Sequence, residues 1–237
     1  HEEADYSQEA HHLVEFGTLL QDDPNVIVPK YHADLSTRDV LAMDFVPSHP
    51  IDDLEAADQS ERDRVATQLI ALMMREVFSF QRVQSDPNFA NFRWQPDTGR
   101  VVLLDFGATR VLSDNLVNAA RQVLRPALDN DLTALANALR ELGLLDDALP
   151  DQARKTILEM VALANEPMMD PDGFDFGNTS LVTELRTSGM ALGQDRSIQS
   201  IPPIEVLYLQ RKAAGLFLLA TRLRARVDLR SLFKSYV

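Results

Sequence analysis

The sequence predicts a mainly helical α+β fold, with short strands in the first half of the chain and helices in the second. Residues 26–29 and 40–46 are apolar runs bounded by turn residues, which predict strands. Residues 92–94 and 100–104 flank a Pro-Asp-Thr-Gly turn and predict a hairpin. After residue 113, apolar residues recur every three or four positions, which predicts helices almost to the end of the chain.

The first element is a helix over residues 2–20, because Tyr6, Ala10 and Leu13 follow a helical period. An Asp-Asp-Pro-Asn turn at residues 22–25 ends this helix. The two predicted strands come next. Because the chain begins within a helical pattern, we expect the sequence to be part of a longer protein.

Two prolines in residues 47–50 predict a boundary between a small lobe, residues 1–49, and a large lobe, residues 50–237. The large lobe opens with a helix capped at Ser60, which has the acid Asp63 at the third helical position. This helix ends just before Asp86 and buries residues spaced three or four apart: Val65, Leu69, Leu72, Met73, Glu76, Val77 and Phe80. Later helices are predicted over residues 115–128, 131–142, 151–165, 180–192 and 203–227.

The composition limits the classes of protein to consider. With 237 residues, 45% of them hydrophobic, the chain is long enough to bury a sizeable core. The net charge of −13 and the lack of a Lys/Arg-rich run argue against a nucleic-acid partner. Because there is no Cys, a disulfide framework and a thiolate zinc site are excluded. The longest apolar stretch, residues 213–220, is too short to span a bilayer.

Three polar residues carry the chemistry. Asp86 is followed five positions later by Asn91, and Asp105-Phe106-Gly107 comes directly after an apolar strand. This order and spacing are those of the catalytic and metal-binding loops of protein kinases. In that arrangement the first Asp orients or deprotonates the attacking hydroxyl or water. The Asn and the second Asp bind Mg²⁺ on the ATP phosphates, and their oxygen atoms are the ligands that Mg²⁺ prefers.

Each of these residues taken alone has a plainer explanation, since Asp before Pro and a lone Asn are common turn formers. The tripeptide Asp-Phe-Gly is also weak evidence, because it recurs at residues 175–177. That second copy follows a Pro- and Gly-rich stretch rather than an apolar strand, so we predict a turn there. The combination of Asp86, Asn91 and Asp105 is what favours a protein-kinase-like fold with a helical large lobe and a truncated small lobe.

Further site residues are predicted in the small lobe. Glu9 lies on the first helix, where kinase-like folds place a Glu that pairs with the phosphate-binding Lys. Residues 40–46 would form the last small-lobe strand and the hinge. There Met43 would close the back of the adenine pocket, and Asp44 and Val46 would contact the nucleotide through the backbone. A solvated Glu9 and an ordinary core Met43 are the alternatives.

The chain is similar to a specific family, the UbiB-like atypical kinases of ubiquinone biosynthesis. The similarity is clearest in residues 84–92, which have Gln-Ser before the Asp in place of His-Arg, and in residues 103–110. Residues 3–10 resemble the Glu-x-Asp helix motif of the family. Residues 174–177 and 209–215 resemble later landmarks, so the resemblance covers nearly the whole chain.

The resemblance implies the roles given above for Asp86, Asn91, Asp105 and Glu9. It adds Glu3 and Asp5 as an acidic motif that, in the family, faces an N-terminal segment covering the substrate site. It also implies ATP and Mg²⁺ as cofactors, ATPase activity, and support of ubiquinone synthesis.

Quinone intermediates and quinone-biosynthesis proteins are the implied partners. The implied location is the cytoplasm, peripheral to the inner membrane, or the mitochondrial matrix in a eukaryote. The family's phosphate-binding Lys and nucleotide loop are not in this sequence, so we expect weak nucleotide binding.

Two other functions stay open at this point. A non-catalytic scaffold (a pseudokinase) could use the same cleft to bind nucleotide or a lipid head group. A small-molecule phosphotransferase of the aminoglycoside or choline kinase type shares the spacing of Asp86, Asn91 and Asp105. Such enzymes usually have His before the first Asp, whereas this chain has Gln84-Ser85.

Overall fold

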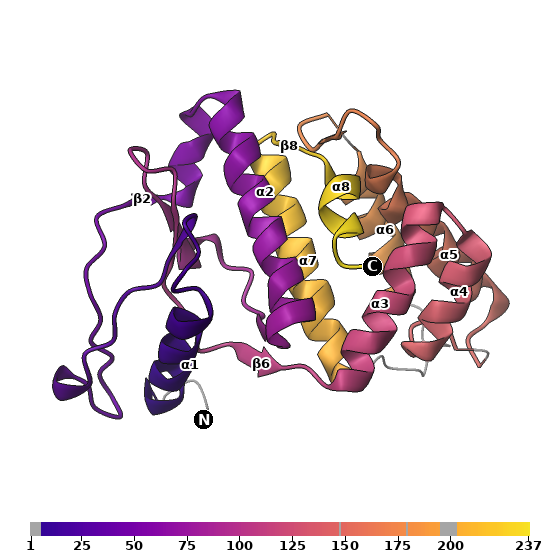
Figure 1. Cartoon of the computed structure of the whole chain (residues 1–237). Coiled ribbons are helices and arrows are strands. Elements are labelled where there is room, and N and C mark those ends of the chain that lie inside the picture. Colours follow the sequence, from indigo (N-terminus) through magenta and orange to yellow (C-terminus); the bar gives the residue numbers. More distant parts are fainter. Residues whose placement is uncertain (1–5, 147, 179, 195–202) are drawn as a thin grey trace.

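A computed structural model describes residues 6–146, 148–178, 180–194 and 203–237. The predicted mainly helical α+β fold is confirmed. Figure 1 shows α2 (Gln59–Arg75) and α7 (Ile204–Arg222) side by side in the middle of the molecule. A small sheet and α1 (Tyr6–Leu19) lie on one side of this pair, and the remaining helices lie on the other.

The predicted hairpin is confirmed and forms the centre of a four-stranded sheet. Its strands β4 (Phe92–Trp94) and β5 (Val101–Leu103) are antiparallel. On the outer sides, β1 (Val26–Ile27) runs parallel to β5, and β2 (His49–Pro50) is antiparallel to β4. Because β1 and β2 come from before the hairpin, the sheet joins residues on both sides of position 49. The lobe boundary at that position stays a prediction.

Helix α1 has the predicted period within the described residues and buries Ala10, Leu13 and Phe16. The Phe16 ring lies 5.0 Å from the ring of Phe106, measured between centroids. Both side chains are buried in the main core. This contact packs α1 against the Asp-Phe-Gly loop, so the helix and the loop are positioned together.

The start of α2 differs from the prediction. The N-cap is Asp58, and Ser60 lies inside the first turn. The backbone explains the difference, because the Asp58 carbonyl already accepts a hydrogen bond from the Arg62 N–H at 3.2 Å. At its other end α2 continues into a π-helical turn, Glu76–Phe80, which leads to β3 (Arg82–Gln84). π-Turns of this kind often mark functional sites.

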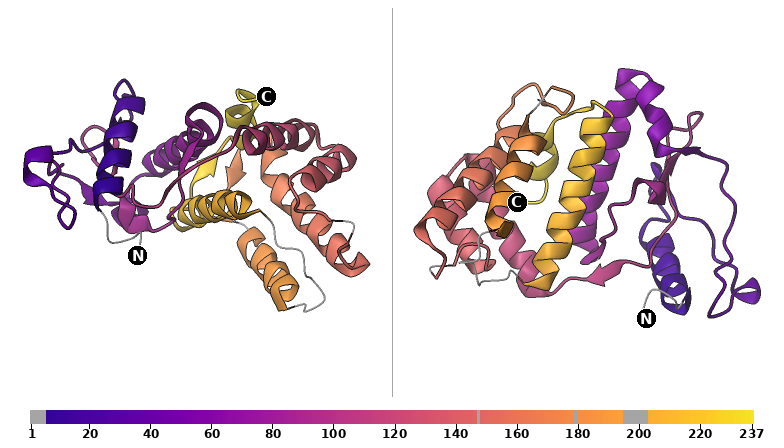
Figure 2. Two further views of the ribbon diagram at one scale, coloured as in Figure 1. Left: turned by 90° about the horizontal axis from the view of Figure 1, so that it is seen from below. Right: turned by 180° about the vertical axis from the view of Figure 1, so that it is seen from behind.

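The second half of the chain is helical, as predicted. Its helices are α3 (Asp114–Asp129), α4 (Leu132–Glu141), α5 (Asp151–Asn165), α6 (Leu181–Gln194), α7 and α8 (Leu229–Lys234). Figure 2 shows α3, α4, α5 and α6 gathered at one end of the molecule, away from α1. No helix among the described residues is long and apolar enough to cross a membrane.

The prediction of one helix over residues 203–227 is wrong at its C-terminal end. Helix α7 ends at Arg222, and Arg224 adopts a left-handed conformation with φ = +48°. Strand β8 (Arg226–Val227) then pairs with β7 (Phe174–Asp175), which includes the Asp of the second Asp-Phe-Gly copy. The predicted turn follows β7, because the Gly177 N–H donates to Asp175 Oδ1 at 2.9 Å.

The strand predicted over residues 40–46 is not formed. Pairing there is limited to two single bridges, Tyr31 with Met43 and Thr37 with Val40. The segment has strand-like residues, but a strand forms only where a neighbouring strand takes up its backbone hydrogen bonds. Residues 30–32 take up only a few of these hydrogen bonds: the His32 N–H donates to the Ala42 carbonyl and the Asp44 N–H donates to the Lys30 carbonyl, both at 2.9 Å. This pairing does not extend beyond a single bridge, and Phe45 is 90% exposed.

Candidate active site

Residues 85–91 form the loop between β3 and β4, and the loop's own side chains stabilise it. Ser85 donates to the Ala108 carbonyl through both its backbone N–H, at 3.1 Å, and its hydroxyl, at 2.8 Å. Asn88 accepts from the Ala90 N–H at 3.1 Å and so caps the short 3₁₀ turn before β4. These hydrogen bonds anchor both ends of the loop.

Asp86 is oriented by two partners. The Asn91 side-chain amide donates to Asp86 Oδ2 at 2.8 Å. From α7, the Arg211 guanidinium donates to Asp86 Oδ1 at 3.2 Å. Asn91 uses the nitrogen of its side-chain amide for this hydrogen bond. The side-chain oxygen of Asn91, an atom type that binds Mg²⁺, is therefore left for another partner.

Asp105 lies just beyond β5, next to Asn91. The Leu104 N–H donates to the backbone carbonyl of Asn91 at 3.1 Å, which joins the two loops. The Gly107 N–H donates to Asp105 Oδ1 at 2.8 Å and fixes the carboxylate. Asn91 and Asp105 line the same small cavity. Asp86, Asn91 and Asp105 therefore form one connected group rather than scattered positions.

Glu9 meets this group from α1. Burial raises the pKa of the Glu9 carboxyl, and the neighbouring Asp105 carboxylate raises it further, whereas a hydrogen bond from the Phe106 backbone lowers it. A Cβ built on Gly107 would lie 3.4 Å from Glu9 Oε2 and from Asp105 Oδ1. Two carboxylates thus border a space that a side chain at Gly107 would fill, and such a place suits a cation.

The donor set fits Mg²⁺ better than a transition metal. Among the described residues there is no cluster of three or more Asp, Glu, His or Cys that could hold an ion by itself. Mg²⁺ typically takes only one or two protein carboxylates and completes its shell with waters and phosphate oxygens. Asp105 and Asn91 would supply such a partial shell.

Replacing Glu9 with Gln should stabilise the protein in the absence of nucleotide and metal. Gln keeps an acceptor for the Phe106 backbone and removes the repulsion from Asp105. Because Glu9 is only half-buried, solvent screens this repulsion, and we expect Tm at neutral pH to rise by about 1–2 °C, less than the 2–4 °C that ~1 kcal/mol gives for a chain of this size. Differential scanning calorimetry in a chelating buffer would measure this. A lower Tm would mean that the Glu9 carboxylate is already neutralised within the protein.

The remaining predicted residues are not joined to this group by any hydrogen bond described above. Met43 packs against the main core and forms the bridge to Tyr31. Asp44 donates its N–H to the Lys30 carbonyl at 2.9 Å, and its carboxylate lies 2.7 Å from His32 Nε2. Val46 accepts a hydrogen bond from the Ser48 hydroxyl. Glu3 and Asp5 lie outside the described residues.

Sequence reasoning missed the residues beneath the site. Lys212 of α7 and Glu76 of the π-turn form an ion pair with a 3.1 Å contact between Lys212 Nζ and Glu76 Oε2. Both side chains are almost completely buried, at 2% and 1% exposed. Burial raises the pKa of Glu76, and the Lys212 ammonium opposes that shift. The sequence contains two signals, the charged residue Glu76 at an inward-facing helical position and the family landmark at residues 209–215, but neither identifies the pair.

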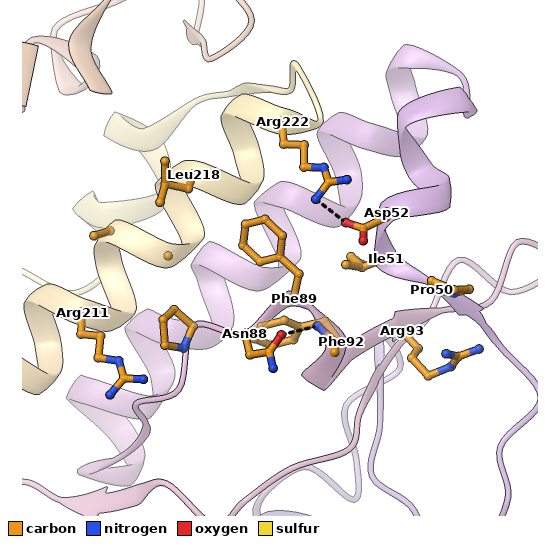
Figure 3. Close-up of a pocket in the computed structure, with 14 residues that line it drawn as sticks. Pro50, Ile51, Asp52, Asn88, Phe89, Phe92, Arg93, Arg211, Leu218 and Arg222 are labelled. Carbon is orange, nitrogen blue, oxygen red and sulfur yellow. Dashed lines mark hydrogen bonds and ion pairs between the residues drawn. The ribbon is translucent and has the colours of Figure 1, made fainter. Parts of the chain in front are cut away.

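A larger cavity of about 730 Å³ opens between the Asp86 loop and α7, as Figure 3 shows. Its walls are mainly apolar and include Phe89, Phe92 and Leu218. Three arginines also line it: Arg93, Arg211 and Arg222. Because Arg211 also contacts Asp86, the cavity adjoins the candidate catalytic residue.

Comparison with known proteins adds independent information. The family model described as "ABC1 atypical kinase-like domain" matches residues 1–139. The chain is 33% identical over 232 residues to the mitochondrial atypical kinase COQ8B of Rattus norvegicus, and 30% identical over 234 residues to the mitochondrial atypical kinase COQ8 of Saccharomyces cerevisiae. Each alignment covers 98% of this chain, and 44% and 46% of the relatives. The chain therefore spans less than half the length of these relatives.

A solved structure has a similar fold. It is the complex of Rv3197 with erythromycin from Mycobacterium tuberculosis, with a TM-score of 0.79. The match covers 100% of this chain and 58% of the other, at 21% sequence identity. At that identity the similarity concerns the fold alone.

Proposed function

The chain belongs to the ABC1 atypical kinase-like family, and from this premise we propose that it binds ATP with Mg²⁺ and transfers or hydrolyses the γ-phosphate. The observation that carries the proposal is the hydrogen bond between Asp86 and Asn91, together with the cavity that Asn91 shares with Asp105. The three side chains are of the types that kinases use for phosphoryl transfer, and they occur in the same order.

Each residue has a distinct proposed role. Asp86 orients the attacking hydroxyl or water and accepts its proton, and Arg211 and Asn91 hold the Asp86 carboxylate for this task. Asn91 and Asp105 hold Mg²⁺, which neutralises charge on the phosphates when it is bound. Glu9 provides a second negative charge beside Asp105, in a position to pair with a cation. Positioning and charge neutralisation supply most of the rate enhancement in this chemistry.

The finer parts of the proposal rest on the family. We propose that the activity supports ubiquinone biosynthesis, with quinone intermediates and the proteins of that pathway as partners, at the surface of a membrane. The relatives named above are mitochondrial atypical kinases. Adenine contacts at Met43, Asp44 and Val46 belong to the same proposal, and so does a place for Glu3 and Asp5 among the catalytic residues, as the acidic motif that faces the segment covering the substrate site.

A second candidate function is phosphorylation of a small molecule. The cavity of about 730 Å³ beside Asp86 has room for an acceptor with an apolar body. The structural neighbour described above is a complex with erythromycin. Mass spectrometry of small hydroxyl compounds incubated with the protein, ATP and Mg²⁺ would separate the two functions. A phosphorylated product would favour this candidate, whereas inorganic phosphate alone would favour hydrolysis.

Nucleotide binding itself can be tested by thermal unfolding of the full-length protein. We expect Tm to rise when ATP and Mg²⁺ are added together, and to rise much less with ATP in a chelating buffer. A ligand at 100 times its Kd stabilises a protein by about 2.7 kcal/mol. For a chain of this size, each ~1 kcal/mol corresponds to a shift of several degrees. The same Tm with and without Mg²⁺ at saturating ATP would contradict a magnesium-dependent site.

A further inference from the structure

One face of α7 lies directly against the two loops of the candidate site. The residues of this face are Tyr208, Arg211, Lys212 and Gly215, which are spaced three or four apart and so fall on one side of a helix. Figure 3 shows α7 running alongside the loop, with Arg211 at one end of the cavity. A helix is a rigid support, so contacts from one face can hold several points of a loop at once.

Each member of the α7 face contacts a different part of the two loops, of the strands that follow them, or of the π-turn. The Tyr208 ring lies 5.4 Å from the guanidinium carbon of Arg110, in the strand after the Asp-Phe-Gly loop. Arg211 donates to Asp86, and Lys212 pairs with Glu76. Lys212 Nζ also lies 5.6 Å from the centre of the Phe92 ring, and Phe92 directly follows Asn91.

Gly215 makes the closest approach. A Cβ at this position would lie 2.2 Å from the Cβ of Pro87, the residue after Asp86. Two non-bonded carbon atoms at this distance clash, so only glycine lets the loop lie this near the helix. The α7 face therefore contacts Asp86, Pro87 and Phe92.

The buried ion pair lies at the floor of the candidate metal site. Glu76 and Lys212 line the same cavity as Asn91 and Asp105. Its volume of about 10 Å³ is close to what a single water molecule needs. Gln84, which is 5% exposed, lines the cavity too, and its side-chain amide has no hydrogen-bond partner among the described residues. The pair thus belongs to the layer of residues directly beneath the metal ligands.

Stability alone is a poor explanation for this pair. Taking two charges out of water costs nearly as much as their attraction returns, and apolar residues of similar shape often stabilise a fold equally well. A buried ion pair does specify one arrangement, because either charge left without its partner is strongly unfavourable. In protein kinases His-Arg precedes the catalytic Asp, whereas this loop has Gln84-Ser85 in that place. The anchoring contacts here come from a helix more than 120 residues later.

We propose that Lys212 is a positioning residue that, through Glu76 and Phe92, holds the catalytic loop and the metal-binding loop in fixed positions relative to each other. Arg211 and Gly215 complete the support on the same face of α7. Lys212 and Glu76 are paired with each other, and they act through the residues proposed to bind metal and substrate. The part of this inference that concerns magnesium rests on the proposed function, whereas the part that concerns the geometry of the loop does not.

The test compares three variants of the full-length protein: Lys212→Met, Glu76→Leu and the double variant. Each single change leaves one buried charge alone and should lower Tm markedly, whereas the double variant should recover most of that loss. In the recovered double variant we expect faster hydrogen–deuterium exchange at residues 85–92 and a tenfold or greater rise in the Mg²⁺ concentration for half-maximal ATP binding. Lys155→Met, in an exposed pair with Glu159, is the matched control and should change neither the exchange at residues 85–92 nor the Mg²⁺ concentration for half-maximal ATP binding.

The proposal is overturned if the double variant regains stability and also shows wild-type exchange at residues 85–92. The exchange result decides the question even if the wild-type protein does not bind ATP, an outcome that would count against the proposed function alone. If the double variant does not fold, Glu76→Gln replaces it, because Gln has nearly the shape of Glu and can still accept a hydrogen bond from Lys212 Nζ. Faster exchange at residues 85–92 in Glu76→Gln would then support the proposal, and unchanged exchange would overturn it.

Discussion

Replacing Asp105 with Asn is expected to lower magnesium-dependent ATP turnover by about 100-fold or more while leaving the fold intact. Asn has nearly the same shape and can still accept the hydrogen bond from the Gly107 N–H. What it lacks is the negative charge that attracts Mg²⁺. Phosphoryl transfer depends mainly on electrostatic stabilisation, and removing one such group commonly costs two to three orders of magnitude. Steady-state phosphate release by the full-length protein, with Mg²⁺ and ATP both titrated, would measure the loss.

The second Asp-Phe-Gly copy supplies a matched control. Asp175 accepts a hydrogen bond from the Gly177 N–H at 2.9 Å, the same contact that Asp105 makes with Gly107. Its carboxylate pairs with Arg226 at the surface rather than facing Asn91. Asp175→Asn should therefore leave turnover within about twofold of the wild type, because surface ion pairs contribute little. Equal losses in both variants, or none in either, would refute the role proposed for Asp105.

Local sequence patterns predicted the parts of the site that depend on short-range geometry. The hairpin between Asn91 and Asp105 was predictable because a turn and two apolar runs determine it within about fifteen residues. The hairpin by itself places the two residues at the same edge of the sheet, where they line one cavity. The helices of the second half were predictable for a similar reason, since a sustained apolar period indicates which face is buried.

The parts that could not be predicted depend on distant partners. The pattern of residues 40–46 indicates a strand, but a strand also needs a neighbour, and its sequence does not say whether one exists. Strand β7 forms because β8, about fifty residues later, pairs with it. Glu76 and Lys212 are 136 positions apart. A charged residue on an inward helix face indicates that a partner is needed, without identifying it.

The contact between α7 and the loop can be tested most directly at Gly215, where Gly215→Ala is expected to lower turnover by tenfold or more. In an ordinary helix this change stabilises by up to about 1 kcal/mol, because Ala is the better helix former. Here the new methyl group would lie 2.2 Å from the Cβ of Pro87, so the loop or the helix must move. Overpacking of this kind typically costs ~1–3 kcal/mol, which outweighs the helical gain. A displacement of about 1 Å at Asp86 would be enough to lower the rate strongly.

Gly193, near the end of α6, is the matched control, because a Cβ there meets nothing within 4 Å. Gly193→Ala should keep wild-type turnover and keep or slightly raise Tm, as expected for Gly→Ala in an open helical position. Turnover and Tm of the two variants, measured side by side in the full-length protein, separate a steric effect on the loop from a general effect of the substitution. Wild-type turnover in Gly215→Ala would show that the Asp86 loop does not depend on close contact with α7. A rate loss confined to Gly215→Ala, with Tm lowered by only a few degrees, is the result that the geometry predicts.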